Sequence, residues 1–314
     1  MRSAFISMLM ALARANKDLY VLTGDLGFSV FEEFQKAYPK RFFDVGVAEQ
    51  NMMGIAAGLA LSGKTVFVYS IIPFVTMRCF EQIRNDICLH QAEVKIVGMG
   101  AGLHYGPAGP SHHATEDIGI MKSLPGMTVI SPATREDTRQ AMQQAVKCKG
   151  PVYIRLAKTQ MDFERKLAGQ RFRIGKALIW EDGRDVTLIS YGRILHKVAM
   201  MKDMLKKKGF SVRLINMHTL KPLDQKVIVD AARETSAIFT VDEHNISGGL
   251  GTGVAEVLAQ CPDQVFFRPF GLPDGYIKTA GQSEYLQNKY GLNEDEMTKT
   301  ILRDLNGVRR VAKV

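Results

Sequence analysis

The sequence predicts an α/β fold of two consecutive domains, each built on a largely parallel sheet. Three observations predict it. Short apolar runs rich in β-branched residues alternate with helix-length segments along the chain, as in parallel sheets covered on both faces. The alternation pauses once, in a polar stretch without period, and then resumes. The chain has 314 residues, which is enough for two ordinary domains.

The first domain is predicted at residues 1–157. Its N-terminal segment carries apolar residues at helical spacing (Phe5, Met8, Leu9) and is interpreted as a first helix rather than as a signal peptide. The strands that we expect after it are 19–22, 65–69, 94–97, 128–130 and 152–156. The helices between them are expected near 48–62, 76–90, 115–123 and 134–147.

The second domain is predicted at residues 172–314, after a polar linker at 158–171. Its expected strands are 186–190, 212–215, 237–241 and 265–268. Its expected helices lie near 194–208, 224–234, 250–259 and 295–305. No internal repeat or low-complexity segment interrupts the pattern.

Composition narrows the class of protein. Hydrophobic residues make up 46% and charged residues 23%, which is globular composition, and no apolar run approaches the ~18 residues of a membrane span. The four cysteines show no metal-ligand spacing, so we expect a cytoplasmic protein without a metal site of its own. The net charge of +9 is scattered. It predicts no nucleic-acid partner and suits a negatively charged small substrate.

One acid stands out in the stretch FFDVGVAEQNMMGIAAGLALSG, residues 42–63, which reads as a buried strand followed by a buried helix. Glu49 lies in the first turn of that helix, where the helix dipole alone favours an acid. A carboxylate that enters an apolar helix must also find a proton donor or a cation. The small residues that follow allow close approach of another backbone, so we expect Glu49 near an interface. They are Gly54, Ala56, Ala57, Gly58 and Ala60.

Two glycine-rich loops are further candidates. The loop GAGLHYGPAGPSHHATED, residues 100–117, contains His104, His112 and His113, and a loop of this length between buried elements is typical of a functional site. Adjacent histidines in extended backbone point to opposite sides, so we expect only one of the last two to face a given site. The stretch GGLGTG, 248–253, follows a strand and opens a helix. Phosphate binding and tight strand–helix packing both explain it.

Several segments, taken in order, resemble the C-terminal half of transketolase. They are DVGVAEQNMMGIAAGLA, GPAGPSHHATEDI, LPGMTVISPA, GPVYIRLAK and LKPLD…VDEHNISGGLG, and together they cover nearly the whole chain. The resemblance implies a pyrimidine-binding fold followed by the transketolase C-terminal domain. It also implies thiamine diphosphate with Mg²⁺ as cofactor, and transfer of a two-carbon ketol unit from a ketose donor to an aldose acceptor.

The resemblance also implies roles for individual residues. Glu49 matches the glutamate that hydrogen-bonds the aminopyrimidine ring nitrogen, and Asp25 matches an aspartate near the cofactor. Phe74 is our choice for the aromatic side chain that stacks on the pyrimidine, with Phe80 as the alternative. His112 matches the histidine that contacts the substrate and reaction intermediate. The residues that match the sugar-phosphate ligands are Arg2, Ser29 and Lys158.

The sequence departs from the family pattern at three places. Ala108 stands where the family has an aspartate that contacts a substrate hydroxyl, and Gly100 replaces a loop histidine. The G-D-G motif that binds the diphosphate and Mg²⁺ is absent from the sequence. The resemblance therefore implies a β-type subunit that is active only with an α-type partner carrying that motif. We expect a homodimer of this chain within an α2β2 heterotetramer.

Three alternatives stay open at this point. A β subunit similar to 1-deoxyxylulose-5-phosphate synthase or one that handles a 2-oxo acid uses the same cofactor. A non-catalytic paralogue acting as a scaffold would tolerate the loss of the loop aspartate. The presence of both Glu49 and His112 favours an enzyme, because a scaffold needs neither.

Overall fold

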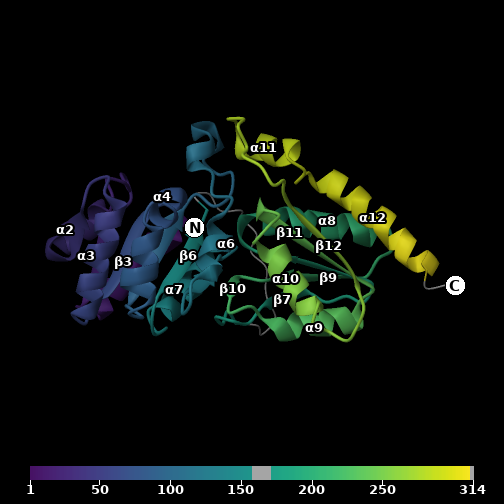
Figure 1. The fold of residues 1–314 in the computed structure, drawn as a ribbon, viewed down its shortest axis with the longest axis horizontal. Coiled ribbons are helices and arrows are strands. Elements are labelled where there is room, and N and C mark those ends of the chain that lie inside the picture. The colour runs from purple at the N-terminus through teal and green to yellow at the C-terminus, as the bar shows by residue number, and fades with distance from the viewer. Residues whose placement is uncertain (158–170, 312–314) are drawn as a thin grey trace.

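The computed structural model describes residues 1–157 and 171–311. They form two sheets that lie next to each other, each covered by helices (Figure 1). The strands are β1 Leu19–Thr23, β2 Phe42–Asp44, β3 Thr65–Ile71, β4 Val94–Met99, β5 Thr128–Ile130, β6 Val152–Leu156, β7 Leu178–Glu181, β8 Val186–Ser190, β9 Val212–Asn216, β10 Thr219–Lys221, β11 Ala237–Asn245 and β12 Phe266–Leu272.

The helices are α1 Arg2–Ala15, α2 Glu32–Ala37, α3 Glu49–Leu61, α4 Ile72–Thr76, α5 Phe80–Gln82, α6 Asp117–Ser123, α7 Arg135–Ala145, α8 Leu195–Lys207, α9 Gln225–Glu234, α10 Leu250–Leu258, α11 Ser283–Lys289 and α12 Glu294–Val311. Short 3₁₀ helices lie between several of them, among them η3 Gly106–Ala108 and η4 Pro110–His112. The predicted class, a two-domain α/β fold with mostly parallel sheets, is confirmed.

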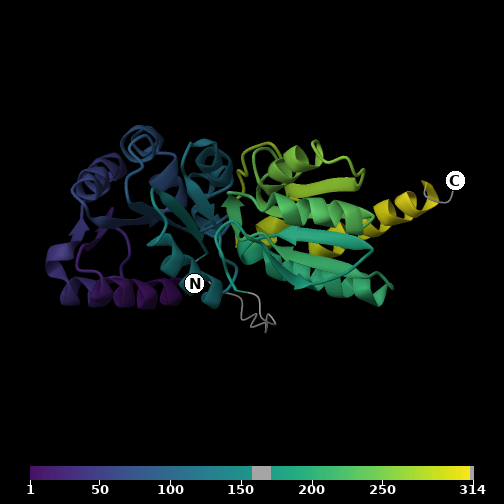
Figure 2. The same cartoon turned by 90° about the horizontal axis from the view of Figure 1, so that it is seen from below.

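The first sheet has seven strands in the order β10-β5-β6-β4-β3-β1-β2, parallel except for β10. Its central strands β3, β4 and β6 are almost wholly buried, as is expected of strands with helices on both faces. Helices α1 and α7 pack together on one face, and Figure 2 shows α1 (purple) along it. The opposite face packs against α3 and α6.

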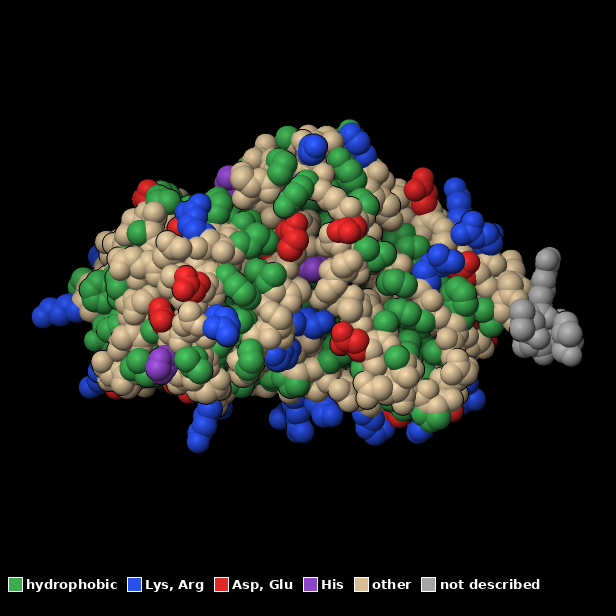
Figure 3. Space-filling view, viewed as in Figure 1, with side chains coloured by type: hydrophobic (Ala, Val, Ile, Leu, Met, Phe, Trp, Pro, Cys, Tyr) green, Lys and Arg blue, Asp and Glu red, His purple; other side chains and the backbone are tan. Residues whose placement is uncertain are grey.

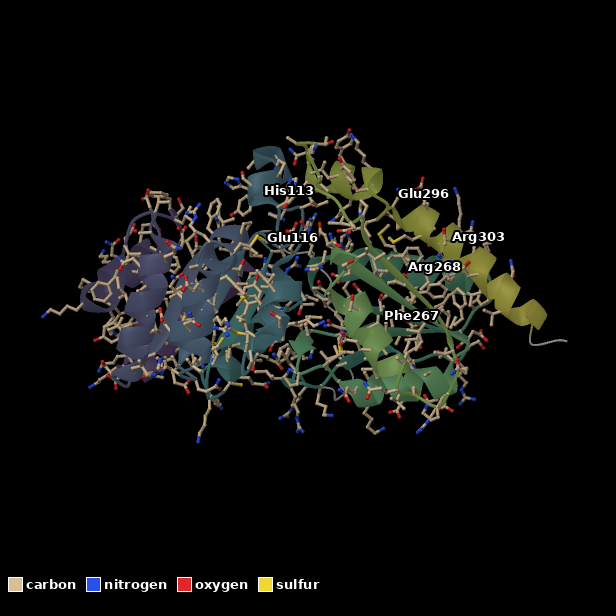
Figure 4. All side chains as sticks on the ribbon, viewed as in Figure 1. His113, Glu116, Phe267, Arg268, Glu296 and Arg303 are labelled. Atoms are coloured by element: carbon tan, nitrogen blue, oxygen red, sulfur yellow. The ribbon has the colours of Figure 1, made fainter. Side chains whose placement is uncertain are left out.

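The second sheet has five strands in the order β12-β11-β8-β9-β7, with β7 antiparallel. Helices α8 and α12 pack against each other on one side, and α9 and α10 do so on the other. Arg268 on β12 forms an ion pair with Asp304 on α12, with 2.6 Å between Nε and Oδ2. Figure 4 labels Arg268 beside α12, which extends toward the C-terminus.

The two parts of the chain are joined by more than the connecting segment. Strand β10, which follows the second-domain strand β9, pairs with β5 at the edge of the first sheet. One hydrophobic core also runs from Met52 and Ile118 of the first part to Ile215 and Ile228 of the second. The division into 1–157, a linker at 158–171 and 172–314 therefore stays a proposal about the sequence.

A buried ion pair forms the polar part of this junction. Nε of Arg155, on β6, donates to Oδ2 of Asp117, on α6, at 2.9 Å, and both side chains are almost fully buried. The same arginine donates to the backbone oxygens of Ala114 and Glu243, which come from the two different parts of the chain. Burial is the largest single influence and opposes the charge of Arg155, but Asp117, Tyr191 and Tyr153 together outweigh it and the pKa of Arg155 is raised.

We expect Arg155→Met to lower the free energy of unfolding by about 3–5 kcal/mol, because it leaves the buried Asp117 carboxylate without its cation. Urea unfolding at fixed protein concentration measures this loss. Arg139→Met is the matched control, since Arg139 is half exposed and its Nη1 lies 3.6 Å from Glu136; we expect a change within ~0.5 kcal/mol there. A loss below about 1 kcal/mol for Arg155→Met would contradict the role of this pair at the junction.

The structure differs from the sequence prediction in six elements. The helix expected near 76–90 is broken into α4, α5 and a π-helical segment, Ile83–Cys88. Strand β2 is half exposed rather than buried, because it lies at the edge of the sheet. Strands β7 and β10 and helices α2 and α11 were not predicted. All four are short, and two of them are edge strands.

Candidate functional site

The candidate site lies where the strand order of the first sheet reverses. From β1 the chain moves to β2 on one side, and α3 then carries it back across β1 to β3 on the other. Glu49, the first residue of α3, lies between these strands at their carboxyl ends. Ser70 at the end of β3 has its Oγ 3.4 Å from Glu49 Oε1, and a Cβ added to Gly24, after β1, would be 3.5 Å from the same oxygen. Such a switch point is where open α/β sheets bind ligands.

The carboxylate of Glu49 is fully buried and paired with a cation. Nη1 of Arg78 donates to Glu49 Oε2 at 2.6 Å, and the side chain of Arg78 is 40% exposed. The guanidinium also lies over the ring of Phe74, with its carbon 4.4 Å from the ring centroid. Nearby Cys79 has its pKa raised to about 12 by burial, with the charge of Glu49 as a further cause. The thiol is therefore not a nucleophile at neutral pH.

His112 extends this row of contacts toward the loop. Its ring lies edge-on to Phe74, with 5.1 Å between centroids, and 6.3 Å from Tyr105. Ser111 Oγ lies 3.0 Å from its Nδ1. His113, by contrast, is buried, and burial lowers its pKa. Figure 4 labels it on the same loop, above Glu116. The two histidines thus have different surroundings, although His112 lies in the 3₁₀ helix η4 and not in the extended backbone that was expected.

The remaining predicted residues lie at varying distances from this row. Arg2, on α1, is near enough to Tyr69 and Tyr105 for its charge to act on both; burial raises the pKa of each tyrosine and Arg2 lowers it in part. Asp25 is exposed on the loop after β1, and its backbone N–H donates to Asp44. Ser29 is exposed in the left-handed region, at φ 59°.

The two remaining predicted residues are Phe80 and Lys158. Phe80 packs against the hydrophobic core under α3, whereas Phe74 contacts both Arg78 and His112. Lys158 lies outside the described residues. The loop residue Gly100 has φ +95°, and a Cβ there would meet the Tyr105 ring at 2.2 Å, so this loop conformation has no room for the histidine that the family carries at that position.

The glycine cluster 248–253 does not present a free anion site. Oδ2 of Asp242 accepts the backbone N–H of Leu250, the first residue of α10, at 2.6 Å. A Cβ added to Gly249 would come within 2.2 Å of the same oxygen. This helix N-terminus already carries a carboxylate, and its glycine allows the close approach. Of the two explanations of the motif, the structure supports tight strand–helix packing.

Arg78 was missed by the sequence reasoning, although the need for a proton donor or a cation beside Glu49 was predicted. The segment after β3 contains two arginines, Arg78 and Arg84, and this was the signal in the sequence that could have indicated a cation near Glu49. In the described part of the chain, no group of three or more His, Cys, Asp or Glu side chains forms a metal site. No helix within residues 1–157 and 171–311 is long and apolar enough to cross a membrane.

Comparison with protein families defines the class: a model of the "Transketolase, pyrimidine binding domain" matches residues 1–162, and one of the "Transketolase, C-terminal domain" matches residues 175–297. The chain belongs to the transketolase family, whose members are transferases. Membership implies dependence on thiamine diphosphate.

Similar proteins show which part of a transketolase this chain corresponds to. The chain is 37% identical to one of the subunits of an apulose-4-phosphate transketolase of Phocaeicola vulgatus, over 96% of each chain. It is 33% identical to the SqwH subunit of a 6-deoxy-6-sulfo-D-fructose transketolase of Clostridium sp., covering 95% of this chain and 92% of that one. A solved structure described as "Split gene transketolase, inactive beta4 tetramer" matches at 36% identity with a TM-score of 0.87, covering 97% and 98%. The chain corresponds to the β-type subunit of a split transketolase.

Proposed function

We propose that this chain, assembled with an α-type subunit, transfers a two-carbon ketol unit from a ketose donor to an aldose acceptor. The observation that carries the proposal is the row Glu49–Arg78–Phe74–His112, which begins at a buried carboxylate at the switch point of the first sheet. A scaffold needs neither a carboxylate at a ligand-binding switch point nor a histidine in line with it. Glu49, Phe74 and His112 are among the catalytic and cofactor-binding candidates of the sequence prediction, and Arg78 is added to them.

The residues at the site fit the aminopyrimidine end of thiamine diphosphate. A planar cationic group, the Arg78 guanidinium, already lies against the Glu49 carboxylate and the Phe74 ring. A flat heterocycle with a basic ring nitrogen makes the same two kinds of contact, an edge-on hydrogen bond and a face-on stack. When bound, the cofactor supplies the electron sink for the two-carbon unit. Phe74 would hold and orient the ring, and Asp25 lies on the adjacent loop.

Two residues of this chain would then handle protons. Glu49, whose side chain is buried, would share a proton with the ring nitrogen. His112 would exchange a proton with a hydroxyl of the sugar, because its ring is half exposed on the loop and has Ser111 beside Nδ1. Ala108 removes one hydroxyl contact that the family pattern provides.

We propose an anionic sugar as substrate. Arg2 is near enough to Tyr105, the neighbour of His112, for its charge to act on that side chain, and Ser29 and Lys158 complete the predicted anion site. The two related transketolases are named for substrates with a phosphate and a sulfo group respectively. A sugar bearing a terminal anion is consistent with both names and with the net charge of +9.

The diphosphate and Mg²⁺ would be bound by the α-type partner, because this sequence has no G-D-G motif. We propose an α2β2 heterotetramer in the cytoplasm, in which two copies of this chain meet through α3. Gly54, Ile55, Gly58 and Leu61 of α3 are exposed. The alanines expected in the same surface, Ala56, Ala57 and Ala60, face the core instead.

The test is reconstitution. The purified chain with thiamine diphosphate and Mg²⁺ should show no ketol transfer, and the description of the similar β4 tetramer as inactive agrees with this. Adding a partner chain that carries G-D-G should produce both a heterotetramer and ketol transfer from a ketose phosphate. Full activity of the chain alone would contradict the split-enzyme proposal, and an inactive heterotetramer would favour the scaffold.

A further inference from the structure

The guanidinium of Arg78 lies at the place that the proposed function gives to the cofactor's pyrimidine ring. Its Nη1 donates a hydrogen bond to Glu49 Oε2 at 2.6 Å, and its central carbon lies over the ring of Phe74, 4.4 Å from the centroid. The oxygen and the ring face are the two features that an aminopyrimidine needs. A guanidinium is flat, delocalised and rich in N–H donors, so it resembles such a heterocycle in shape and in hydrogen bonding.

The reason for this contact is the burial of Glu49. Its side chain has no exposed area, and an ionised carboxylate without a partner is strongly unfavourable in such surroundings. Of the other side chains at this carboxylate, Ser70 offers only a long hydrogen bond of 3.4 Å. Arg78 therefore supplies the compensating charge as long as nothing else does.

Arg78 is also placed so that it can leave. It lies in the break between α4, which ends at Thr76, and α5, which begins at Phe80. Its side chain is 40% exposed, whereas that of its partner is wholly buried. The guanidinium can therefore move into solvent by side-chain rotation, without unfolding a helix.

We propose that Arg78 is a displaceable stand-in for the aminopyrimidine: it neutralises Glu49 before the cofactor binds, and binding of the cofactor moves it away from the carboxylate. This inference rests on the proposed function. The arginine is a positioning residue that keeps the Glu49 carboxylate and the Phe74 ring in place. Because the arginine competes with the cofactor, it raises the apparent Kd of the cofactor. The increase is larger when the arginine occupies a larger fraction of the sites.

The first measurement uses the chain alone and needs no cofactor. Arg78→Met should lower Tm by about 2–5 °C, because it leaves a buried carboxylate unpaired. The same substitution in a Glu49→Gln background should change Tm by less than ~1 °C, because the charge to be compensated is gone. Arg84→Met is the matched control, since Arg84 is exposed and contacts Asn85. Equal effects of Arg78→Met in both backgrounds would overturn the proposal.

The second measurement is the Kd of thiamine diphosphate with Mg²⁺, by calorimetry on the α–β assembly. The assembly with the Arg78→Met variant should bind thiamine diphosphate about 3- to 10-fold tighter than the assembly with the natural chain. This is the gain expected when a half-exposed competitor is removed. Arg78→Lys keeps the charge but not the plane, and should retain most of the Tm with an intermediate Kd. Arg84→Met should leave Kd unchanged.

A merely structural ion pair predicts the opposite result for Kd. Unchanged or weaker binding in Arg78→Met, in a chain that still shows the Tm coupling to Glu49, would overturn the stand-in role and leave the proposed function intact. An assembly of the natural chain that binds no thiamine diphosphate would overturn the proposed function and this inference together.

Discussion

Glu49→Gln is expected to reduce kcat of the assembled enzyme by about 100- to 10,000-fold, the usual range for losing one proton-transfer contribution. Glutamine has nearly the same shape, so the chain should fold and the assembly should still bind thiamine diphosphate. What is lost is the carboxylate that shares a proton with the ring nitrogen. The measurement is steady-state ketol transfer at saturating cofactor, with Tm as the check on folding.

Glu93→Gln is the matched control for this substitution. Glu93 also accepts from a buried lysine, with 2.9 Å between its Oε2 and Lys95 Nζ, but it precedes β4 at the opposite, amino-terminal edge of the sheet. We expect the kcat of the assembled Glu93→Gln variant to stay within about twofold of that of the natural enzyme, which is a difference of ~0.4 kcal/mol in the activation barrier. Activity of Glu49→Gln within about threefold of the natural enzyme would remove Glu49 from the mechanism.

Gly58→Leu is expected to abolish assembly, and ketol transfer with it, while the separate chain stays folded. Nothing lies within 4 Å of a Cβ built at Gly58 or Gly54, so the larger side chain fits the chain by itself. Replacing a helical glycine even favours the helix, by up to about 1 kcal/mol. A leucine on this face would nevertheless keep another backbone from approaching closely. Figure 3 shows hydrophobic side chains on the surface at this end of the molecule.

Sedimentation velocity on the chain, with and without the partner, measures the loss of assembly. Gly307→Leu is the control, because Gly307 is a glycine of α12 with nothing within 4 Å of its built Cβ, at the other end of the molecule. We expect the Gly307→Leu variant to form the same oligomers as the natural chain and to show the same rate of ketol transfer. If Gly58→Leu formed the same oligomer as the natural chain, the exposed face of α3 would not be the interface between copies.

Much of the fold was predictable because it depends on local patterns. The apolar runs of β3, β4 and β6 are buried on both faces, so every residue in them is constrained and the strand is visible in the sequence. Short edge strands such as β2 and β10 have no such signal, since part of each faces solvent or a segment distant in the chain. The break between α4 and α5 was also invisible, because the expected helix had no interior proline or glycine at Arg78.

The sequence by itself determined the fold class, the position of Glu49 in a first helical turn and the need of that carboxylate for a partner. Each follows from composition and neighbours along the chain. Only the tertiary structure decided that the partner is Arg78, that Phe74 rather than Phe80 lies beside it, and that Asp242 occupies the N-terminus of α10. The physical reason is that a buried charge needs compensation within a few ångströms. Which side chain provides it depends on where helices end and how strands are ordered, and local sequence does not carry that information.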